Sequence, residues 1–185
     1  MRRAMTLGAA VFLTTGVLAA CSSGNSGTAT PAASATPAPT TTTTAQATAW
    51  HPCSIPDSDI AGVGLNPSTK QEDGPGKVKF PGWDICSWLA EKPNWYVLNV
   101  YSTRDHSYDE VVHNTTLYKN PEPVTVEGRP GTRLFSATED HDCTIALDSK
   151  PPVQFQISAK PSAREPGDAC AEVTRITTAL VKNIP

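Results

Sequence analysis

Two segments near the C-terminal end alternate between apolar and polar side chains, and they limit the fold more than any other feature. In residues 143–147 and again in residues 153–159, every second side chain is apolar. Alternation with a period of two indicates a β-strand with one buried face. Ser149-Lys150-Pro151-Pro152 between them has turn composition, so we expect an antiparallel hairpin. Its second face is polar, which favours a sheet covered on one side only.

The last segment of the chain is predicted to provide that cover. Residues 166–182 have helical character, and an apolar stripe runs along them at helical spacing. We expect this stripe to pack on the apolar face of the hairpin. Its members are Cys170, Val173, Ile176, Thr177, Leu180 and Val181.

Similar patterns predict the remaining elements. Helices are expected at Pro52–Val63 and Ser107–Tyr118, and a long loop at Leu65–Pro81. The chain is therefore assigned to the α+β class: a single antiparallel sheet with flanking N- and C-terminal helices. The further strands are expected at residues 83–89 and 95–101, around a turn at Glu91–Asn94, and at residues 124–127 and 132–137, around a turn at Gly128–Gly131.

The first twenty residues have the layout of a secretory signal. Arg2 and Arg3 precede an uncharged, mostly apolar run that is too short for a comfortable membrane span. Leu18-Ala19-Ala20-Cys21 resembles the bacterial lipobox, which implies cleavage before Cys21 and lipid on its thiol. Two acyl chains anchor stably where one does not. We expect a protein held on the outer face of the cell membrane; an ordinary signal with an incidental cysteine is the alternative.

Residues 21–49 are expected to form a disordered linker behind the lipidated cysteine. After Cys21 they contain Ser, Thr, Ala, Gly, Pro, Asn and Gln, without a charged or aromatic residue. Such a segment cannot bury enough apolar surface to offset its ordering entropy. Its Thr and Pro content suggests O-glycosylation, which an intact mass would test. Residues 50–185 then have the usual size of one globular domain.

Four cysteines lie in this domain, and an even number in an exported chain indicates two disulfides. Three pairings are possible. We favour Cys53–Cys86 and Cys143–Cys170, because these are neighbours in sequence and each pair would join a helix to a strand. Single, scattered cysteines are unlike zinc ligands.

The charge balance argues against a nucleic-acid partner. The chain has 15 Lys and Arg against 18 Asp and Glu, and cleavage removes Arg2 and Arg3, so the mature net charge is −5. A nucleic-acid-binding domain needs a basic patch. The membrane is expected to be a partner only through the lipid on Cys21.

Motifs for catalysis are weak. The sequence has no G-x-S-x-G, although a Ser-His-Asp triad can assemble in space from distant residues. Glu139, Asp140, His141 and Asp142 are the best candidates for a metal site, because a hard cation takes such ligands. A solvated loop is the favoured interpretation, since neighbouring residues of an extended chain point in opposite directions. No cofactor is expected.

Aromatic residues gather in the N-terminal half of the domain. Trp88 is expected in the core beside Cys86. Trp83 and Trp95 are expected on the opposite sides of their strands from Trp88 and Tyr96. If exposed, they would mark a binding face, because tryptophan often lines ligand pockets and partner surfaces.

Five segments resemble the actinobacterial lipoprotein family of the domain of unknown function 3558. They are HPCSIPDSDIAGVGL, WDICSW, VEGRPG, DCTIALD and DACAEVTRITTALVKNIP. The resemblance covers residues 50–185, together with the lipobox and the linker. It implies a small α+β domain with one antiparallel sheet and flanking helices. It implies no established activity and no catalytic residues.

The function expected from the sequence is that of a non-enzymatic envelope lipoprotein. It would bind a lipid, a glycan or an envelope protein through one face of the sheet or through the loop Leu65–Pro81. An accessory subunit that only holds another envelope protein is a second possibility. The enzymatic alternative is a serine hydrolase or a metal-dependent one that uses His141 and its acidic neighbours. Stoichiometric metal in the purified protein would favour the metal-dependent enzyme.

Overall fold

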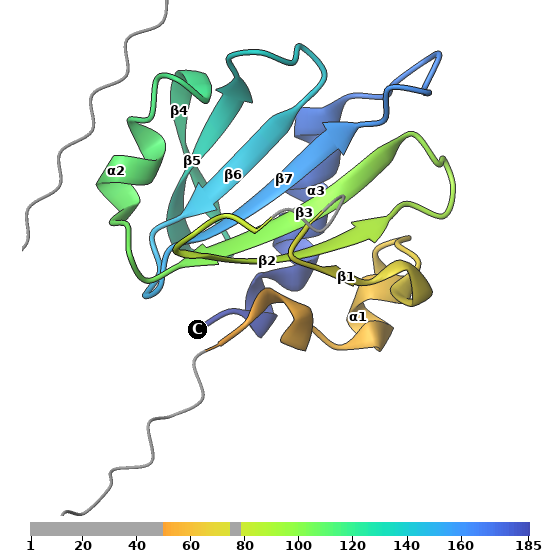
Figure 1. Cartoon of the computed structure of the whole chain (residues 1–185), viewed down its shortest axis with the longest axis horizontal. Helices are drawn as coiled ribbons and strands as arrows, with labels where there is room; N and C mark the ends of the chain where they lie inside the picture. Colours follow the sequence, from red (N-terminus) through yellow and green to blue (C-terminus); the bar gives the residue numbers. More distant parts are fainter. Residues whose placement is uncertain (1–49, 75–78) are drawn as a thin grey trace, which may run out of the picture. The chain divides into compact units, whose positions relative to one another are not determined.

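The structure is a computed structural model that describes residues 50–74 and 79–185. Their centre is a seven-stranded sheet in the order β1-β2-β3-β7-β6-β5-β4, with every neighbouring pair antiparallel (Figure 1). The signal, Cys21 and the linker lie outside the described residues. The strands are β1 (Gln71–Glu72), β2 (Trp83–Leu89), β3 (Tyr96–Thr103), β4 (Tyr118–Val126), β5 (Arg129–Ser136), β6 (Cys143–Leu147) and β7 (Val153–Ala159).

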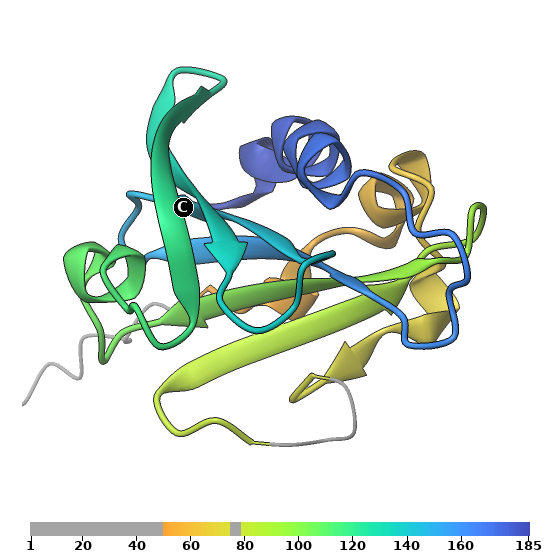
Figure 2. The same cartoon turned by 90° about the horizontal axis from the view of Figure 1, so that it is seen from above.

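Helices cover one face of this sheet. The longest, α3 (Ala169–Leu180), begins after the N-cap Asp168, whose carboxylate accepts hydrogen bonds from two backbone N–H groups of the first turn. A short helix, α1 (Asp57–Gly62), lies on the same side (Figure 2). The predicted α+β fold with one antiparallel sheet is confirmed. In the described part of the chain, no helix is long and apolar enough to cross a membrane.

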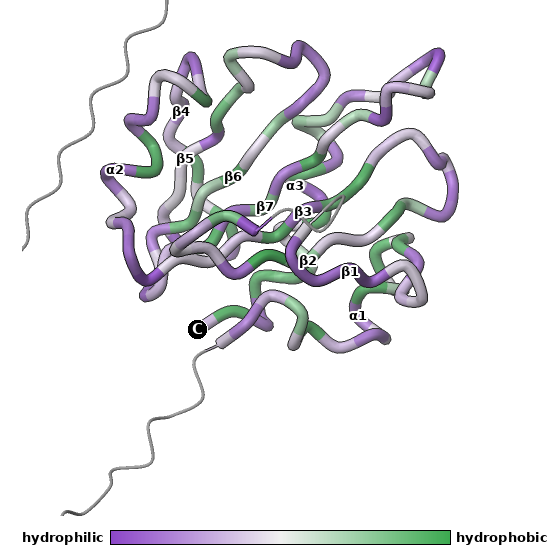
Figure 3. The backbone as a smooth tube through the Cα atoms, viewed as in Figure 1, coloured by the Kyte–Doolittle hydropathy of each residue, from purple (hydrophilic) through white to green (hydrophobic). Residues whose placement is uncertain are grey.

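The main core lies between α3 and one face of the sheet. Cys86, Val100, Phe155 and Ile145 pair in one row across four neighbouring strands, and each is buried. The helix adds Val173, Ile176 and Leu180, as its predicted stripe required. Figure 3 shows hydrophobic residues recurring along the strands and α3, with hydrophilic residues on most loops. Each fully buried side chain of this size contributes about 1.5–3 kcal/mol.

Both predicted disulfides are present, and both lie on the α3 side of the sheet. Cys53–Cys86 joins the 3₁₀ turn Pro52–Ser54 to β2, and Cys143–Cys170 joins β6 to α3. The bonded cysteines are 33 and 27 residues apart in sequence. Closing loops of that length in the unfolded chain stabilises the fold by about 3.5 kcal/mol per bond in the chain-entropy description.

The helix predicted at Pro52–Val63 is wrong in its extent. The segment forms the 3₁₀ turn, then a break, then α1. The cause is Pro56, which has no N–H and disfavours helical backbone at the residue before it. Ile55 accordingly has ψ of 127° and ends the turn.

The helix predicted at Ser107–Tyr118 is also too long. The observed helix, α2, covers only Tyr108–Val112. Ser107 and Glu110 form a capping box that starts it. After it, the side chain of Asn114 accepts hydrogen bonds from the backbone N–H groups of Thr116 and Leu117. This turn competes with helix continuation, so Tyr118 begins β4 instead of ending a helix.

The β4–β5 turn was placed too late in the sequence. It consists of Glu127 and Gly128, both with positive φ, which is the pattern of a two-residue hairpin turn. Gly131 lies inside β5. β4 accommodates Pro121 and Pro123 because it is an edge strand, where one side of the backbone has no strand partner.

The second face of the sheet is partly covered, which the sequence did not indicate. After β3, at the centre of the sheet, the chain crosses to β4 at the far edge, and α2 lies on this crossing. Val111 and Val112 pack there on Leu134 and Ala146, which form a second, smaller hydrophobic cluster. The crossing segment therefore builds a wall on a face that would otherwise be open.

Candidate functional site

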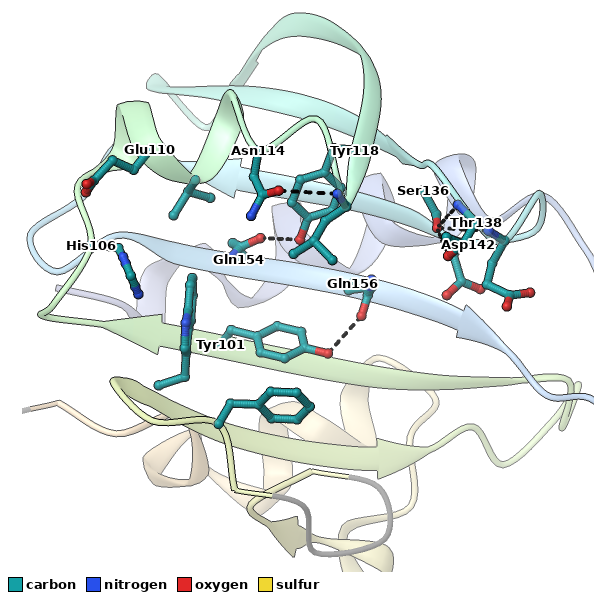
Figure 4. A pocket seen from close by; sticks show the side chains of 15 residues that line it. Tyr101, His106, Glu110, Asn114, Tyr118, Ser136, Thr138, Asp142, Gln154 and Gln156 are labelled. Carbon is teal, nitrogen blue, oxygen red and sulfur yellow. Dashed lines mark hydrogen bonds between the residues drawn. The ribbon is translucent and has the colours of Figure 1, made fainter. Parts of the chain in front are cut away.

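A pocket of about 380 Å³ lies on the face of the sheet opposite α3. We call it the sheet-face pocket. Tyr101 of β3 and Gln154 and Gln156 of β7 form its floor, at the centre of the sheet (Figure 4). Along their strands these residues alternate with the core residues Val100 and Phe155. Their side chains therefore point to the other face of the sheet, away from the core.

The walls come from segments that are distant in sequence. Glu110, Val111, Asn114 and Leu117 belong to the α2 crossing. Phe80, Trp83 and His106, which flank or belong to β2 and β3, also line it. Ser136, Thr138 and Asp142 lie at one end, Tyr118 lies beside Asn114, and Glu139 also lines the pocket (Figure 4). In Figure 4, Glu110 and His106 lie at one end of the pocket and Asp142 at the other.

Two tyrosine–glutamine hydrogen bonds fix the floor. The Tyr101 hydroxyl donates to Gln156 Oε1 at 2.8 Å, and the Tyr118 hydroxyl donates to Gln154 Oε1 at 2.7 Å. Both bonds use the amide oxygens. Each glutamine therefore keeps its NH₂ group, with two N–H donors, for partners other than the tyrosines.

The electrostatics of the floor keep both phenols protonated. Burial raises the pKa of Tyr118 to about 12. Burial also raises the pKa of Tyr101, and repulsion from the ionised forms of Tyr118 and Asp142 raises it further. Both hydroxyls therefore act as hydrogen-bond donors at neutral pH, which is the role that the two bonds to glutamine require.

An aromatic cluster fixes Trp83 at the pocket wall. Its ring stacks on His106, with centroids 5.6 Å apart and planes at 26°. Tyr101 meets it edge-on, at 6.2 Å and 89°. Such pairs stabilise each other by about 0.5–1.5 kcal/mol beyond burial. Trp83 is half-buried, so part of its surface stays open to the pocket.

Asp142 closes one end of the pocket. Its carboxylate accepts a hydrogen bond from the backbone N–H of Ala159 at 2.9 Å. Burial raises the pKa of this carboxyl, and the hydrogen bond opposes part of that rise. A half-buried carboxylate beside apolar and aromatic groups favours a counter-charge or donors from a ligand.

The two tryptophans proposed as a binding face do not lie together. Trp83 lines the pocket, but Trp95 precedes β3 and is 8% exposed, in the core on the α3 side. The condition under which Trp95 would mark a binding face, exposure of its side chain, is therefore not met. The reason is Gly167, which packs so closely on the indole that an added Cβ would lie 2.8 Å from Trp95 Cζ2.

The acidic segment before β6 does not gather into a metal site. Within residues 50–74 and 79–185, no three His, Cys, Asp or Glu side chains come close enough together to hold a metal ion. Asp140 is exposed and pairs with Lys119 at 3.4 Å. Glu139 and Asp142 line the pocket, whereas His141 does not.

The geometry for a serine nucleophile is also not seen among the described residues. In those ranges no serine hydroxyl hydrogen-bonds to a histidine ring. Ser136, the serine of the pocket, accepts hydrogen bonds from the backbone N–H groups of Thr138 and Glu139. Its oxygen therefore holds a turn in place.

Several pocket residues were not singled out from the sequence as site residues. They are His106, Tyr118, Gln154 and Gln156. The two glutamines did carry a signal, because they stand on the polar side of a strand whose other side is apolar throughout. Tyr118 carried no such signal, because the sequence pattern predicted it at the end of a helix and not in a strand.

The comparisons with known proteins give the family of the chain. The family described as Protein of unknown function (DUF3558) matches residues 16–183. The chain belongs to the DUF3558 family. The match spans all seven strands and both disulfides of this DUF3558 protein. No curated protein and no solved structure matches it. Its function must therefore be inferred from the pocket itself.

Proposed function

We propose that this DUF3558 protein is a lipid-anchored envelope protein whose domain binds a small ligand in the sheet-face pocket. One observation carries the proposal. Three large hydrophobic side chains are exposed in the described residues: Phe80 (52%), Leu89 (37%) and Leu117 (53%). Phe80 and Leu117 both line this pocket, although they are 37 residues apart in sequence. Exposed apolar groups gathered around a concavity are typical of binding sites.

The dimensions of the pocket limit the ligand. A volume of about 380 Å³ is near the lower end of the range for small-molecule sites. A compact molecule fits, and so does the terminal group of a larger lipid or glycan. The polar floor of Gln154 and Gln156 provides hydrogen-bond donors for orientation, while the aromatic wall provides contact area.

Two features support the extracytoplasmic location. The lipobox residues 18–21 predict export and lipid attachment at Cys21. Independently, all four cysteines of the domain are paired as disulfides, which persist in oxidising compartments outside the cytoplasm. A linker behind the anchor would then hold the domain away from the membrane surface.

Native mass spectrometry tests the binding function. The full chain, extracted oxidised from its own envelope, is expected to carry an extra mass in a substantial fraction of molecules. The double variant Phe80→Ser/Leu117→Ser is expected to lose most of it. Leu89→Ser is the matched control, because Leu89 is also exposed but lies outside the sheet-face pocket. A bare mass for the natural chain, or equal retention in all three proteins, would contradict the proposal.

Phase partitioning tests the anchor. The natural chain is expected in the detergent phase, with a mass that reports cleavage before Cys21 and added acyl chains. Cys21→Ser is expected to carry no lipid and to remain uncut. A natural chain that is cut elsewhere and carries no acyl mass would make the N-terminus an ordinary export signal.

A further inference from the structure

The charges around the sheet-face pocket are of one sign. Glu110, Glu139 and Asp142 line it, and no lysine or arginine among the described residues does. Among the described lining residues the one histidine is His106, and its ring is stacked on Trp83. An anionic ligand would meet three like charges without a fixed counter-charge, which costs energy at short range in a partly dry site.

The aromatic rings of the pocket favour the opposite sign. Phe80, Trp83, Tyr101 and Tyr118 all line it. The faces of aromatic rings are negative, so they attract a cation that lies within about 6 Å of the ring centre. This attraction is strongest for tryptophan, and it increases when the cation is shielded from water. Aromatic rings beside carboxylates are the arrangement that recognises alkylated ammonium groups.

The position of the carboxylates fits the same class of ligand. Asp142 and Glu110 lie at opposite ends of the pocket, with Tyr101 on the floor between them (Figure 4). One carboxylate oxygen of Asp142 is held by the backbone N–H of Ala159. The carboxylate therefore stays fixed at the pocket end, where it can receive a positive group without a rearrangement of the loop.

We propose that the ligand of the sheet-face pocket carries an organic cation, an ammonium group with apolar substituents, held against the ring of Tyr101 beside the carboxylate of Asp142. This inference rests on the proposed binding function. The amide NH₂ groups of Gln154 and Gln156 then bind an oxygen of the same ligand, such as a hydroxyl or an ether. An amino alcohol combines the two features in a molecule that fits the volume.

Three probes of one shape and different charge test this inference. Choline is the cation, 3,3-dimethyl-1-butanol replaces its nitrogen by carbon, and 3,3-dimethylbutyrate has the same branched end with a negative group. Each is titrated into the full chain while tryptophan fluorescence is recorded. Choline is expected to bind at least about tenfold more tightly than the neutral alcohol. The anion is expected not to bind.

Two variants connect the preference to the pocket. Asp142→Asn is expected to weaken choline binding by about tenfold and to leave binding of the neutral alcohol unchanged. Asp140→Asn is the matched control, because Asp140 lies in the same loop but outside the pocket and pairs with Lys119. It is expected to bind both probes as the natural chain does.

The outcomes separate this inference from the proposed function. Equal binding of choline and the alcohol, or no binding of any probe, overturns the organic cation. In that case, whether the pocket binds any ligand is still decided by native mass spectrometry, which compares the extra mass on the natural chain with that on Phe80→Ser/Leu117→Ser. Glycerophosphocholine, which adds a phosphate to the same cation, identifies the source. Binding as tight as that of choline indicates a lipid head group, and weaker binding indicates a small free ammonium compound.

Discussion

The carboxylate of Asp142 and the backbone N–H of Ala159 are 2.9 Å apart, which joins the loop before β6 to the last residue of β7. This bond places a half-buried carboxylate at the end of a pocket. Burial raises its pKa, so the folded state holds the ionised form less well than the unfolded chain does. The ionised carboxylate of Asp142 therefore lowers the free energy of unfolding at neutral pH.

Asp142→Asn should consequently raise stability while it lowers cation binding. The asparagine oxygen can still accept the bond from Ala159, and the buried charge is gone. We expect a gain in the free energy of unfolding at pH 7 of up to about 1 kcal/mol, since the group is half exposed and screened by water. The gain should shrink as the pH falls through the raised folded pKa and vanish only well below the unfolded pKa of about 3.9, where the natural carboxyl is protonated in both states. Urea unfolding at several pH values measures it; a loss of stability at pH 7 would contradict it.

Glu172 has the opposite pH dependence. It accepts hydrogen bonds from Arg175 and from the Tyr96 hydroxyl, both at 2.6 Å, so this network links α3 to β3. The bonds from Arg175 and then Tyr96 lower the pKa of Glu172. Its stabilisation is therefore present above the unfolded pKa near 4.3 and is lost as the pH falls through the lower folded pKa.

Glu172→Gln is expected to lower the free energy of unfolding by about 1 kcal/mol at pH 7. The difference from the natural chain should shrink below about pH 4. Glu165→Gln is the control, because Glu165 is exposed and outside this network, and it should show neither effect. A deficit that is independent of pH would mean that the carboxylate charge is not what the network uses.

Gly167→Ala tests the packing that buries Trp95. The new methyl group would lie 2.8 Å from Trp95 Cζ2, so the indole must move. We expect a loss of about 1–3 kcal/mol and an altered near-ultraviolet circular dichroism signal from tryptophan. Gly62→Ala is the control, since nothing lies within 4 Å of its new Cβ. An equal effect of the two changes would count against the close contact.

Thr177 offers a stabilising change. It is fully buried in α3, and its hydroxyl has no hydrogen-bond partner among the described residues. Thr177→Val keeps the shape and removes the unpaired polar group, so a gain of about 1 kcal/mol in thermal or urea unfolding is expected. The neighbour Thr178 is exposed and donates to Thr174 O, so Thr178→Val should give no such gain. A destabilised Thr177→Val would reveal a partner for that hydroxyl.

The sequence predicted the core side of the domain well, because periodicity reports burial. Cys143, Ile145 and Leu147 alternate with less apolar residues, and their strand and its disulfide to α3 lie where expected. The errors occurred where local hydrogen bonds competed with periodicity. Tyr118 lies at helical spacing from Tyr108 and its stripe, yet the side chain of Asn114 ends the helical segment before it.

The pocket could not be predicted in the same way, because it depends on the order of the strands. Tyr101 and Gln156 share a floor only because β3 pairs with β7, although the chain between these two strands forms α2, β4, β5 and β6. No local pattern fixes that pairing. Trp95 shows the same limit: its burial comes from Gly167, a residue in a loop far along the sequence.

The alternation of side chains along the strands has a consequence for how the sequence of this domain can change during evolution. The disulfides and the packing of α3 use one set of alternate residues, and the pocket floor uses the other set. Under the proposed binding function, substitutions at Tyr101, Gln154 or Gln156 would change what the domain recognises and leave the core packing on the other face intact. Relatives with unrelated ligands can share one scaffold, and a designer can exchange the floor of this pocket without rebuilding the protein that carries it.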